Sequence, residues 1–371
     1  MSPSGSTLRT LISQIGKENG RRFRQLSLSS SSSYKRHHPS VITSDEVQSV
    51  IMPAFNIVNG INDIEKTATS ISPSQFDFSD IFENPQVHIR NRQEVEEKLR
   101  TIVSGGREKL LVISDFDFTL SRYKDEEGKM CWTTHGVFDN LANRVDPKLS
   151  QIFHDLRDKY FPIEFCDKLT PEEKTPHMEA WWGTSHNHII KAGFHKEMIE
   201  EFVKQANIVL KNGAEELIDN LDKADVPFIV FSAGIGNIIE MYFKHKLGCI
   251  PANTHLISNM MLFNDEGIAS DFSEPLIHTF CKNSTVIRKD AQFYHDLDNR
   301  FNVVLLGDSQ GDVHMAIGAD KRGPTLKIGY LNDKVEKLLD HYMEIYDIVL
   351  VLDPTMDVPN KVLDKVLNNK A

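Results

Sequence analysis

Residues 109–120 read Lys-Leu-Leu-Val-Ile-Ser-Asp-Phe-Asp-Phe-Thr-Leu. An unbroken apolar run, Leu-Leu-Val-Ile, precedes a serine and then two aspartates separated by one residue. An apolar run without alternation is typical of a strand that is buried on both faces, as in a parallel sheet. The stretch therefore predicts a central strand that ends at the acidic pair Asp115 and Asp117.

Three other stretches repeat this form and predict further strands, at residues 226–232, 301–308 and 346–352. Amphipathic helices are expected between them, for example at residues 213–223 and 235–246. Strands and helices that alternate with short connections are the pattern of an α/β fold. We therefore predict a doubly wound, Rossmann-like parallel sheet.

One connection is too long for a simple crossover, because about a hundred residues separate Leu120 from Val226. Residues 145–222 are rich in helix formers, and their apolar side chains follow a helical spacing. This segment predicts a mostly helical insert. We expect the catalytic core at residues 81–130 and 223–371, and the helical cap at residues 131–222.

Polar residues follow the apolar run of each of the first three predicted strands. Carboxyl ends of parallel strands meet at one edge of an open sheet, and ligands bind beyond that edge. A lysine lies between the second and the third strand. We expect these side chains to form one site, made of Asp115, Asp117, Ser232, Ala233, Lys282, Asp308 and Asp312.

The chemistry of this set follows from its charges. Clustered carboxylates repel one another unless a cation lies among them. Oxygen ligands without histidine or cysteine favour Mg²⁺. A serine hydroxyl, backbone N–H groups and a lysine beside such an ion can hold a phosphate dianion. One aspartate can attack phosphorus while the other transfers protons, which predicts covalent catalysis.

The stretch Asp115-Phe116-Asp117-Phe118-Thr119 resembles the D-x-D-x-T motif of the haloacid dehalogenase superfamily. Ser232, Lys282 and the pair Asp308 and Asp312 are similar to its other three motifs. Longer stretches resemble the cytosolic 5′-nucleotidase III family, whose members act on pyrimidine and 7-methylguanosine monophosphates. These stretches are residues 114–122, 169–186, 231–236, 305–312 and 327–335, and the resemblance covers residues 85–355.

The resemblance implies a role for each acidic residue. Asp115 would be the nucleophile and a metal ligand. Asp117 would act as general acid and base, and its backbone carbonyl would also bind Mg²⁺. Asp308 would complete the protein ligands of the ion, and Asp312 would support the ion through water.

The resemblance also implies how the substrate is bound. Ser232 and the backbone of Ala233 would hold the phosphate, and Lys282 would neutralise its charge. The helical insert would be a cap that closes over the site and excludes water. Four cap residues would bind the nucleoside, the first of them by accepting hydrogen bonds from the base: Glu164, Ser185, Trp182 and His135.

These roles predict a 5′-nucleotidase that depends on Mg²⁺ and hydrolyses 7-methyl-GMP, CMP or UMP through an aspartyl-phosphate. Trp182 and the run Pro176-His177-Met178 favour the 7-methylguanosine form. The family also implies phosphotransfer to a second nucleoside. The alternative is a phosphatase of a non-nucleotide small phosphomonoester, whose substrate would offer no base to Glu164. A non-enzymatic binding protein would be expected to lack the nucleophile, the acid or a metal ligand, and none is missing.

The composition limits the partners. A formal net charge of −11 argues against a nucleic acid polymer as ligand. No run approaches the roughly 18 apolar residues of a membrane span, so no membrane partner is expected. Four cysteines without a C-x-x-C pair fit a reducing compartment. The resemblance implies a cytoplasmic monomer.

The N-terminus differs from the rest of the chain. Its first 44 residues contain seven lysines or arginines, one acid and twelve serines. We expect residues 1–80 to form a disordered tail with phosphorylatable serines. The alternative is a transit peptide that directs the protein to an organelle, because such peptides are rich in arginine and serine and poor in acids.

Overall fold

The structure is a computed structural model that describes residues 76–166, 168–283, 297, 299–316 and 323–368. Most of the predicted tail, including the candidate transit peptide, lies outside them. Among the described helices, none has the length and apolar character that crossing a membrane requires.

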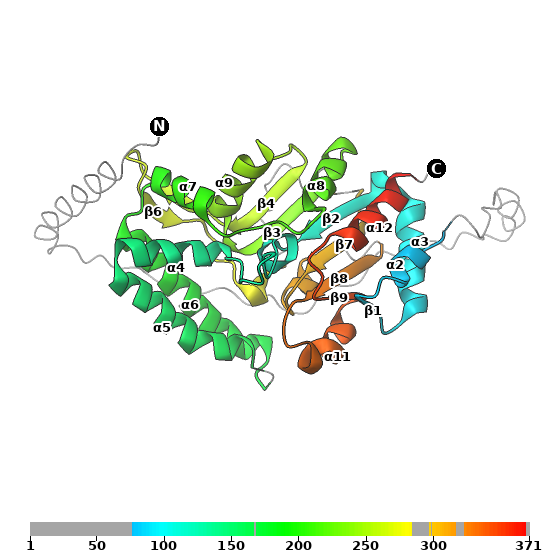
Figure 1. Cartoon of the computed structure of the whole chain (residues 1–371), viewed down its shortest axis with the longest axis horizontal. Helices are drawn as coiled ribbons and strands as arrows, with labels where there is room; N and C mark the ends of the chain where they lie inside the picture. Colours follow the sequence, from blue (N-terminus) through cyan, green and yellow to red (C-terminus); the bar gives the residue numbers. More distant parts are fainter. Residues whose placement is uncertain (1–75, 167, 284–296, 298, 317–322, 369–371) are drawn as a thin grey trace, which may run out of the picture. The chain divides into compact units, whose positions relative to one another are not determined.

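A seven-stranded sheet forms the centre, in the order β1-β9-β8-β7-β2-β3-β4 (Figure 1). Six strands are parallel, and β1 at the edge runs antiparallel to β9. The prediction of an α/β fold with a mostly parallel sheet is confirmed. The strands are β1 Val87–His88, β2 Leu110–Ser114, β3 Phe228–Ile235, β4 Thr254–Asn259, β7 Asn302–Gly307, β8 Thr325–Leu331 and β9 Ile348–Val351.

Successive residues of β2 face opposite sides of the sheet, as the two-residue period of a strand requires. Leu110 and Val112 belong to one apolar core, whereas Leu111 and Ile113 belong to a second. The first core is covered by α3 Arg92–Gly105, α8 Ala214–Lys223, α9 Gly236–Leu247 and α12 Asp357–Leu367, and the second by α11 Val335–Ile345. Burial on both faces explains the unbroken apolar run of this strand.

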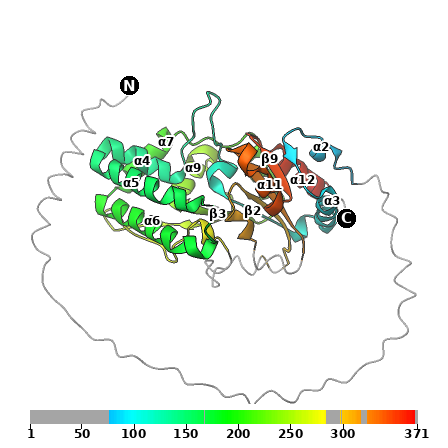
Figure 2. The same cartoon turned by 90° about the horizontal axis from the view of Figure 1, so that it is seen from below.

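Four helices follow one another between the turn after β2 and α8: α4 Thr134–Val145, α5 Pro147–Glu164, α6 Pro171–Ala192 and α7 Lys196–Gln205. Their starts are set by local chemistry. Thr170 and Glu173 form a capping box before α6, with Pro171 in the first turn, and Gly193 ends the helix at φ 64°. Figures 1 and 2 show α4, α5 and α6 packed side by side.

A two-stranded antiparallel hairpin, β5 Met261–Phe263 and β6 Ala269–Phe272, lies outside the main sheet and packs against α6. The hairpin was not among the strands predicted from the sequence. The first described helix, α2 Ser79–Phe82, packs on α12. The short helices are η2 Arg107–Lys109, η3 Phe116–Leu120, η4 Thr279–Cys281 and η5 Asp312–His314.

Candidate active site

The turn after β2 places the two aspartates. The Asp115 N–H donates to the Leu306 carbonyl at 3.0 Å, which keeps this residue in line with β7. The chain then turns sharply through η3, where Asp117 and Phe118 have non-helical backbone angles and Phe118 adopts a positive φ of 62°. Ser121 Oγ accepts a hydrogen bond from the Phe118 N–H at 2.9 Å. This fixed turn separates Asp115, at the end of the strand, from Asp117 above it.

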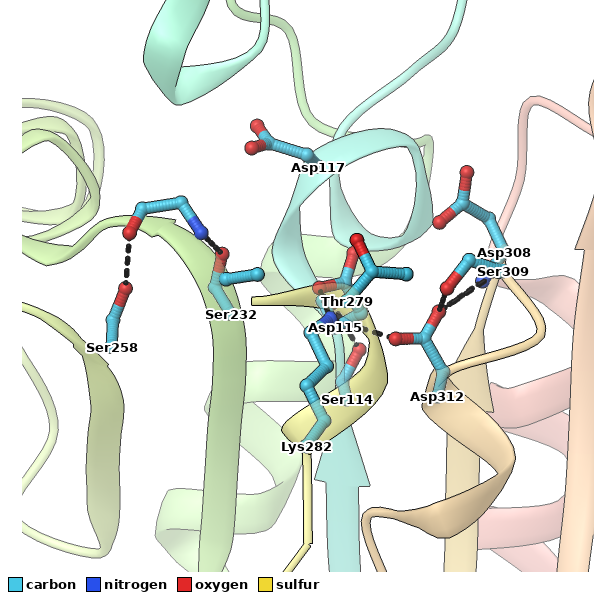
Figure 3. Close-up of polar contacts among 12 residues, drawn as sticks. Ser114, Asp115, Asp117, Ser232, Ser258, Thr279, Lys282, Asp308, Ser309 and Asp312 are labelled. Atoms are coloured by element: carbon cyan, nitrogen blue, oxygen red, sulfur yellow. Dashed lines mark hydrogen bonds and ion pairs between the residues drawn. The ribbon is translucent and has the colours of Figure 1, made fainter. Parts of the chain in front are cut away.

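Three carboxylates gather beside one lysine (Figure 3). One carboxylate oxygen from each of Asp115, Asp308 and Asp312 lies within 4.8 Å of the other two. Lys282 Nζ forms an ion pair with Asp115 and donates to Asp312 Oδ1 at 2.7 Å. Lys282 and Asp312 are 5% and 0% exposed, so water does little to screen these charges.

Asp312 also holds the loop that carries Asp308. Its Oδ2 atom accepts hydrogen bonds from the Asp308 N–H at 3.0 Å and from the Ser309 N–H at 2.8 Å. The Ser309 hydroxyl adds a third bond at 2.9 Å. A Cβ atom at Gly307 would lie 2.4 Å from Asp312 Cβ, so only glycine leaves room for this arrangement.

The electrostatics of the cluster suit a cation. Burial raises the pKa of Asp115, and Lys282 opposes this rise. Burial and the neighbouring Asp115 raise the pKa of Asp308 well above its ordinary value. Both shifts express the cost of confining three carboxylates with a single lysine. A divalent ion among these oxygens would relieve that repulsion, and oxygen donors are the ligands that Mg²⁺ prefers.

Asp117 is oriented by the start of α4. Thr134 donates to its carboxylate twice, from the backbone N–H at 2.9 Å and from Oγ1 at 2.8 Å. Burial raises the pKa of Asp117 to about 6, although both Thr134 hydrogen bonds oppose the rise. A carboxyl with this pKa can both hold and release a proton near neutral pH.

The carboxyl end of β3 is irregular beside Asp117, because its pairing with β4 shifts register between Phe231 and Ile235. Ser232 Oγ accepts a hydrogen bond from the Gly234 N–H at 3.0 Å. The Ala233 carbonyl accepts from Asn259 Nδ2 at 2.9 Å. A Cβ atom at Gly234 would lie 2.0 Å from Thr134 Oγ1, so a side chain at this position would displace the residue that orients Asp117.

Glu164, at the end of α5, reaches the core through a hydrogen bond. Its Oε1 atom accepts from Thr279 Oγ1 at 2.6 Å. Burial raises the pKa of Glu164, and the bond from Thr279 opposes that rise. Thr279 begins the short helix η4, which is followed directly by Lys282. Ser185, also predicted to bind the nucleoside, is buried in α6.

The two predicted aromatic contacts of the nucleoside lie together. Trp182 Nε1 donates to the Ala233 carbonyl at 2.8 Å, and the edge of the Trp182 ring meets His135 with centroids 5.8 Å apart. His135 is parallel to His186 at 6.2 Å, and His186 stacks on Phe272 of the hairpin at 3.8 Å. The rings of His135 in α4, His186 in α6 and Phe272 in β6 thus lie parallel in one column.

Residues 118–367 match the model of the pyrimidine 5′-nucleotidase (UMPH-1) family. The chain belongs to the pyrimidine 5′-nucleotidase family. The match begins directly after Asp117, so it does not itself include the two aspartates of the first motif. Membership of the pyrimidine 5′-nucleotidase family confirms the predicted relationship and the prediction that the protein is a hydrolase of the 5′-nucleotidase class.

Curated relatives cover most of the chain. A putative cytosolic 5′-nucleotidase 3 of Caenorhabditis elegans is 48% identical, over 93% of this chain and 94% of the relative. The 7-methylguanosine phosphate-specific 5′-nucleotidase of Homo sapiens is 38% identical, over 76% of this chain and 92% of the relative. Relatives of this member of the pyrimidine 5′-nucleotidase family thus include a protein named for a methylated purine nucleotide.

A solved structure supports the fold. The crystal structure of cytosolic 5′-nucleotidase IIIB bound to cytidine superposes with a TM-score of 0.72 at 31% identity, over 78% of this chain and 97% of that one. The haloacid dehalogenase-like fold that the sequence predicted is confirmed for this member of the pyrimidine 5′-nucleotidase family.

The structure brings together the predicted residues Asp115, Lys282, Asp308 and Asp312, and it places Asp117 nearby. Sequence reasoning missed Thr134, Asn259 and Thr279, which orient predicted site residues without belonging to a motif. The signal for Thr134 was weak, since a threonine pair before an amphipathic stretch indicates only a helix start.

Proposed function

We propose that this protein hydrolyses nucleoside 5′-monophosphates with Mg²⁺, through an aspartyl-phosphate on Asp115. The observation that carries the proposal is the convergence of three carboxylates and Lys282 at the carboxyl ends of β2 and β7, in a chain of a nucleotidase family. The role of each residue below is part of this proposal.

Asp115, Asp308 and Asp312 offer the oxygen donors that Mg²⁺ prefers, and they lie close enough to share one ion. We assign Asp115 and Asp308, together with the Asp117 carbonyl, as ligands, and Asp312 as a support through water. When bound, Mg²⁺ would neutralise negative charge on the phosphate oxygens.

In the first step, a carboxylate oxygen of Asp115 attacks phosphorus and the bond between phosphorus and the ribose 5′ oxygen breaks. Asp117 gives its proton to that oxygen, so a neutral nucleoside leaves. The two Thr134 hydrogen bonds hold the Asp117 carboxyl in place for this transfer. Lys282, Ser232 and the Ala233 N–H stabilise the charge on the phosphoryl group.

In the second step, Asp117 takes a proton from a water molecule, and the water oxygen bonds to phosphorus. The bond between phosphorus and Asp115 breaks, so inorganic phosphate leaves and the Asp115 carboxylate is restored. A second nucleoside in place of water would give phosphotransfer. Lys282, which is paired with the free Asp115 carboxylate, would pair with the phosphoryl group while Asp115 is phosphorylated.

For the nucleoside, we propose that Glu164 accepts hydrogen bonds from the base and that Ser185, Trp182 and His135 line the same pocket. Glu164 has one oxygen bonded to Thr279 Oγ1, which leaves the other oxygen for the base. A carboxylate suits the amino group of cytosine or a methylated, cationic guanine. The relatives named for 7-methylguanosine phosphate support 7-methyl-GMP as the first substrate to test. We also propose a cytosolic location, since the Caenorhabditis elegans relative is named as cytosolic.

The test is phosphate release from 7-methyl-GMP, CMP, UMP, AMP and phosphoserine, each with Mg²⁺ and with EDTA. Release from 7-methyl-GMP or CMP that needs Mg²⁺ would support the proposal. Release mainly from phosphoserine would overturn the nucleotide assignment and favour a different phosphomonoester. The variant Glu164→Gln keeps the shape of the side chain. We expect it to raise KM for 7-methyl-GMP more than for UMP, whose base has no amino group to donate to Glu164.

A further inference from the structure

Two tyrosine hydroxyls hold the back of the loop that carries Asp308. Tyr342 lies in α11 and Tyr346 directly follows this helix, four residues later, so both rings project from the same side of it. Tyr342 Oη donates to the Asp308 carbonyl at 2.6 Å, and Tyr346 Oη donates to the Ser309 carbonyl at 2.6 Å. The two side chains are 7% and 3% exposed.

The front of the same loop is held by Asp312, whose Oδ2 atom accepts from the N–H groups of Asp308 and Ser309 (Figure 3). The peptide group between these two residues is therefore bound at both ends. Its carbonyl points to Tyr342, and its N–H points to the acidic cluster. A rotation of this peptide would turn the negative end of its dipole toward carboxylates and would swing the Asp308 side chain with it.

The sheet is shaped to admit one of these rings. Gly307 and Gly329 are paired residues of the neighbouring strands β7 and β8. A Cβ atom at Gly329 would lie 2.5 Å from the Tyr346 ring, and one at Gly307 would lie 2.8 Å from the Tyr346 hydroxyl. Two strands thus lack side chains at the place where Tyr346 passes. Apolar packing of the Tyr346 ring would explain the space between the strands. It would not explain why the Tyr346 hydroxyl reaches the buried Ser309 carbonyl.

We propose that Tyr342 and Tyr346 are positioning residues for the divalent cation, because their hydroxyls fix the peptide groups that aim the carboxylates of Asp308 and Asp312. This inference rests on the proposed function. Neither tyrosine touches the substrate. Loss of a hydroxyl leaves a buried carbonyl without a donor, and the loop gains freedom to turn away from the ion.

The test compares Tyr342→Phe, Tyr346→Phe and the double variant with Tyr330→Phe in the full-length chain. Tyr330 is the matched control because it is fully buried in β8 and its hydroxyl donates to the Thr355 carbonyl at 2.9 Å, away from this loop. The readout is the dissociation constant of Mn²⁺ alone, measured by electron paramagnetic resonance without substrate. Urea unfolding in EDTA measures fold stability separately.

We expect the double variant to bind Mn²⁺ about 10-fold to 100-fold more weakly, since partners behind metal ligands have effects of this size. Each single variant should show part of that loss, and Tyr330→Phe should stay within about 2-fold of the wild type. Activity of the double variant should recover when Mg²⁺ is raised, with KM for the nucleotide at saturating Mg²⁺ unchanged.

Two results would overturn the inference, and they are distinguishable. If the wild type binds Mn²⁺ and the variants bind it equally well, the hydroxyls only stabilise the fold, and the proposed function stands. If the wild type itself binds no divalent ion, the inference and the proposed metal dependence fail together. Should Tyr346→Phe be too unstable to purify, the same comparison is made with Tyr342→Phe alone.

Discussion

Asp115 and Lys282 are 167 positions apart in the chain, yet their ion pair is almost closed to solvent. Three carboxylates share this space with that single lysine. At the scale of the residue, the site therefore carries an excess of negative charge that a bound cation would balance. Stability and catalysis are expected to depend on the same few side chains.

The first prediction concerns metal removal. Because an ion that binds only the folded state stabilises it, Mg²⁺ at 100 times its dissociation constant should add about 2.7 kcal/mol to the free energy of unfolding. Thermal unfolding in Mg²⁺ and in EDTA measures this difference as a change in Tm. In Asp308→Asn the change should shrink, and an equal change would argue against Asp308 as a ligand.

The second prediction concerns the nucleophile. Asp115→Asn keeps the size of the side chain but removes the charged oxygen that attacks phosphorus. We expect kcat for phosphate release to fall by at least about 10⁴-fold, a loss typical of removing a nucleophile. Circular dichroism should show an unchanged fold. Residual activity within tenfold of the wild type would assign the nucleophile to another residue.

At the scale of the element, the end of β4 acts as a clamp on the carboxyl end of β3. Asn259 is fully buried, and its amide donates to the carbonyls of Ala233 at 2.9 Å and Ile277 at 2.8 Å. Its Oδ1 atom accepts from the Ile277 N–H at 2.9 Å. One side chain thus connects the carboxyl end of β3, which we propose binds the phosphate, to the segment that leads to Lys282.

The third prediction tests this clamp. Asn259→Ala removes the side-chain partner of the buried Ile277 carbonyl and N–H, whereas the Ala233 carbonyl keeps its bond from Trp182 Nε1. We expect the free energy of unfolding to fall by about 2–3 kcal/mol. KM for the nucleotide should rise, because Ala233 loses one of the two side-chain hydrogen bonds to its carbonyl and its N–H is held less firmly toward the phosphate. Urea unfolding and steady-state kinetics measure the two effects. A loss of stability with KM unchanged would limit Asn259 to a structural role.

The strands that the sequence revealed are those with unbroken apolar runs, namely β2, β3, β7 and β9. β8 was missed because Lys327 and Gly329 interrupt its apolar pattern, and Gly329 is required by the ring of Tyr346. β4 was missed because its sequence is Thr-His-Leu-Ile-Ser-Asn, and its terminal Ser258 and Asn259 donate to backbone carbonyls at the carboxyl end of β3. Interactions between distant segments thus decided the residue types, and a local pattern cannot show them.

At the scale of the whole molecule, the same limit applies to the site. The residues that follow apolar strands were accessible from sequence because strand order brings them to one edge. Thr134, Asn259, Tyr342 and Tyr346 were not, because each acts through a hydrogen bond across elements. The side chains that form the candidate site could be predicted from the sequence. The residues that hold those side chains in place could be identified only from the fold.

The fourth prediction concerns acid. Burial lowers the pKa of His135 to about 4, and burial together with His135 lowers that of His186 to about 3, from an ordinary value of 6.5. Below pH 6.5 the unfolded chain takes up these protons before the folded chain does. The contribution of these two histidines to the free energy of unfolding is therefore complete above pH 6.5. It is lost as pH falls toward 4, by up to about 1.4 kcal/mol per pH unit for each histidine.

Urea unfolding of the wild type and of His186→Phe between pH 7 and pH 4 measures this loss. The substitution keeps an aromatic ring against Phe272 and removes one titrating group, so its stability should fall less steeply with acid. Equal slopes for the two proteins would mean that His186 does not contribute.

The place of β2 in the sheet also has a consequence for protein synthesis. Both neighbours of this strand are made later, and residues 115–301 separate its end from the start of β7. At ribosomal rates of about 5–20 residues per second, the apolar strand waits roughly 10–40 s for that partner. We expect nascent chains arrested before residue 302 to be held by chaperones and to release no phosphate, whatever their helical content. The appearance of enzymatic activity in ribosome-bound chains would then show when β7 has paired with β2.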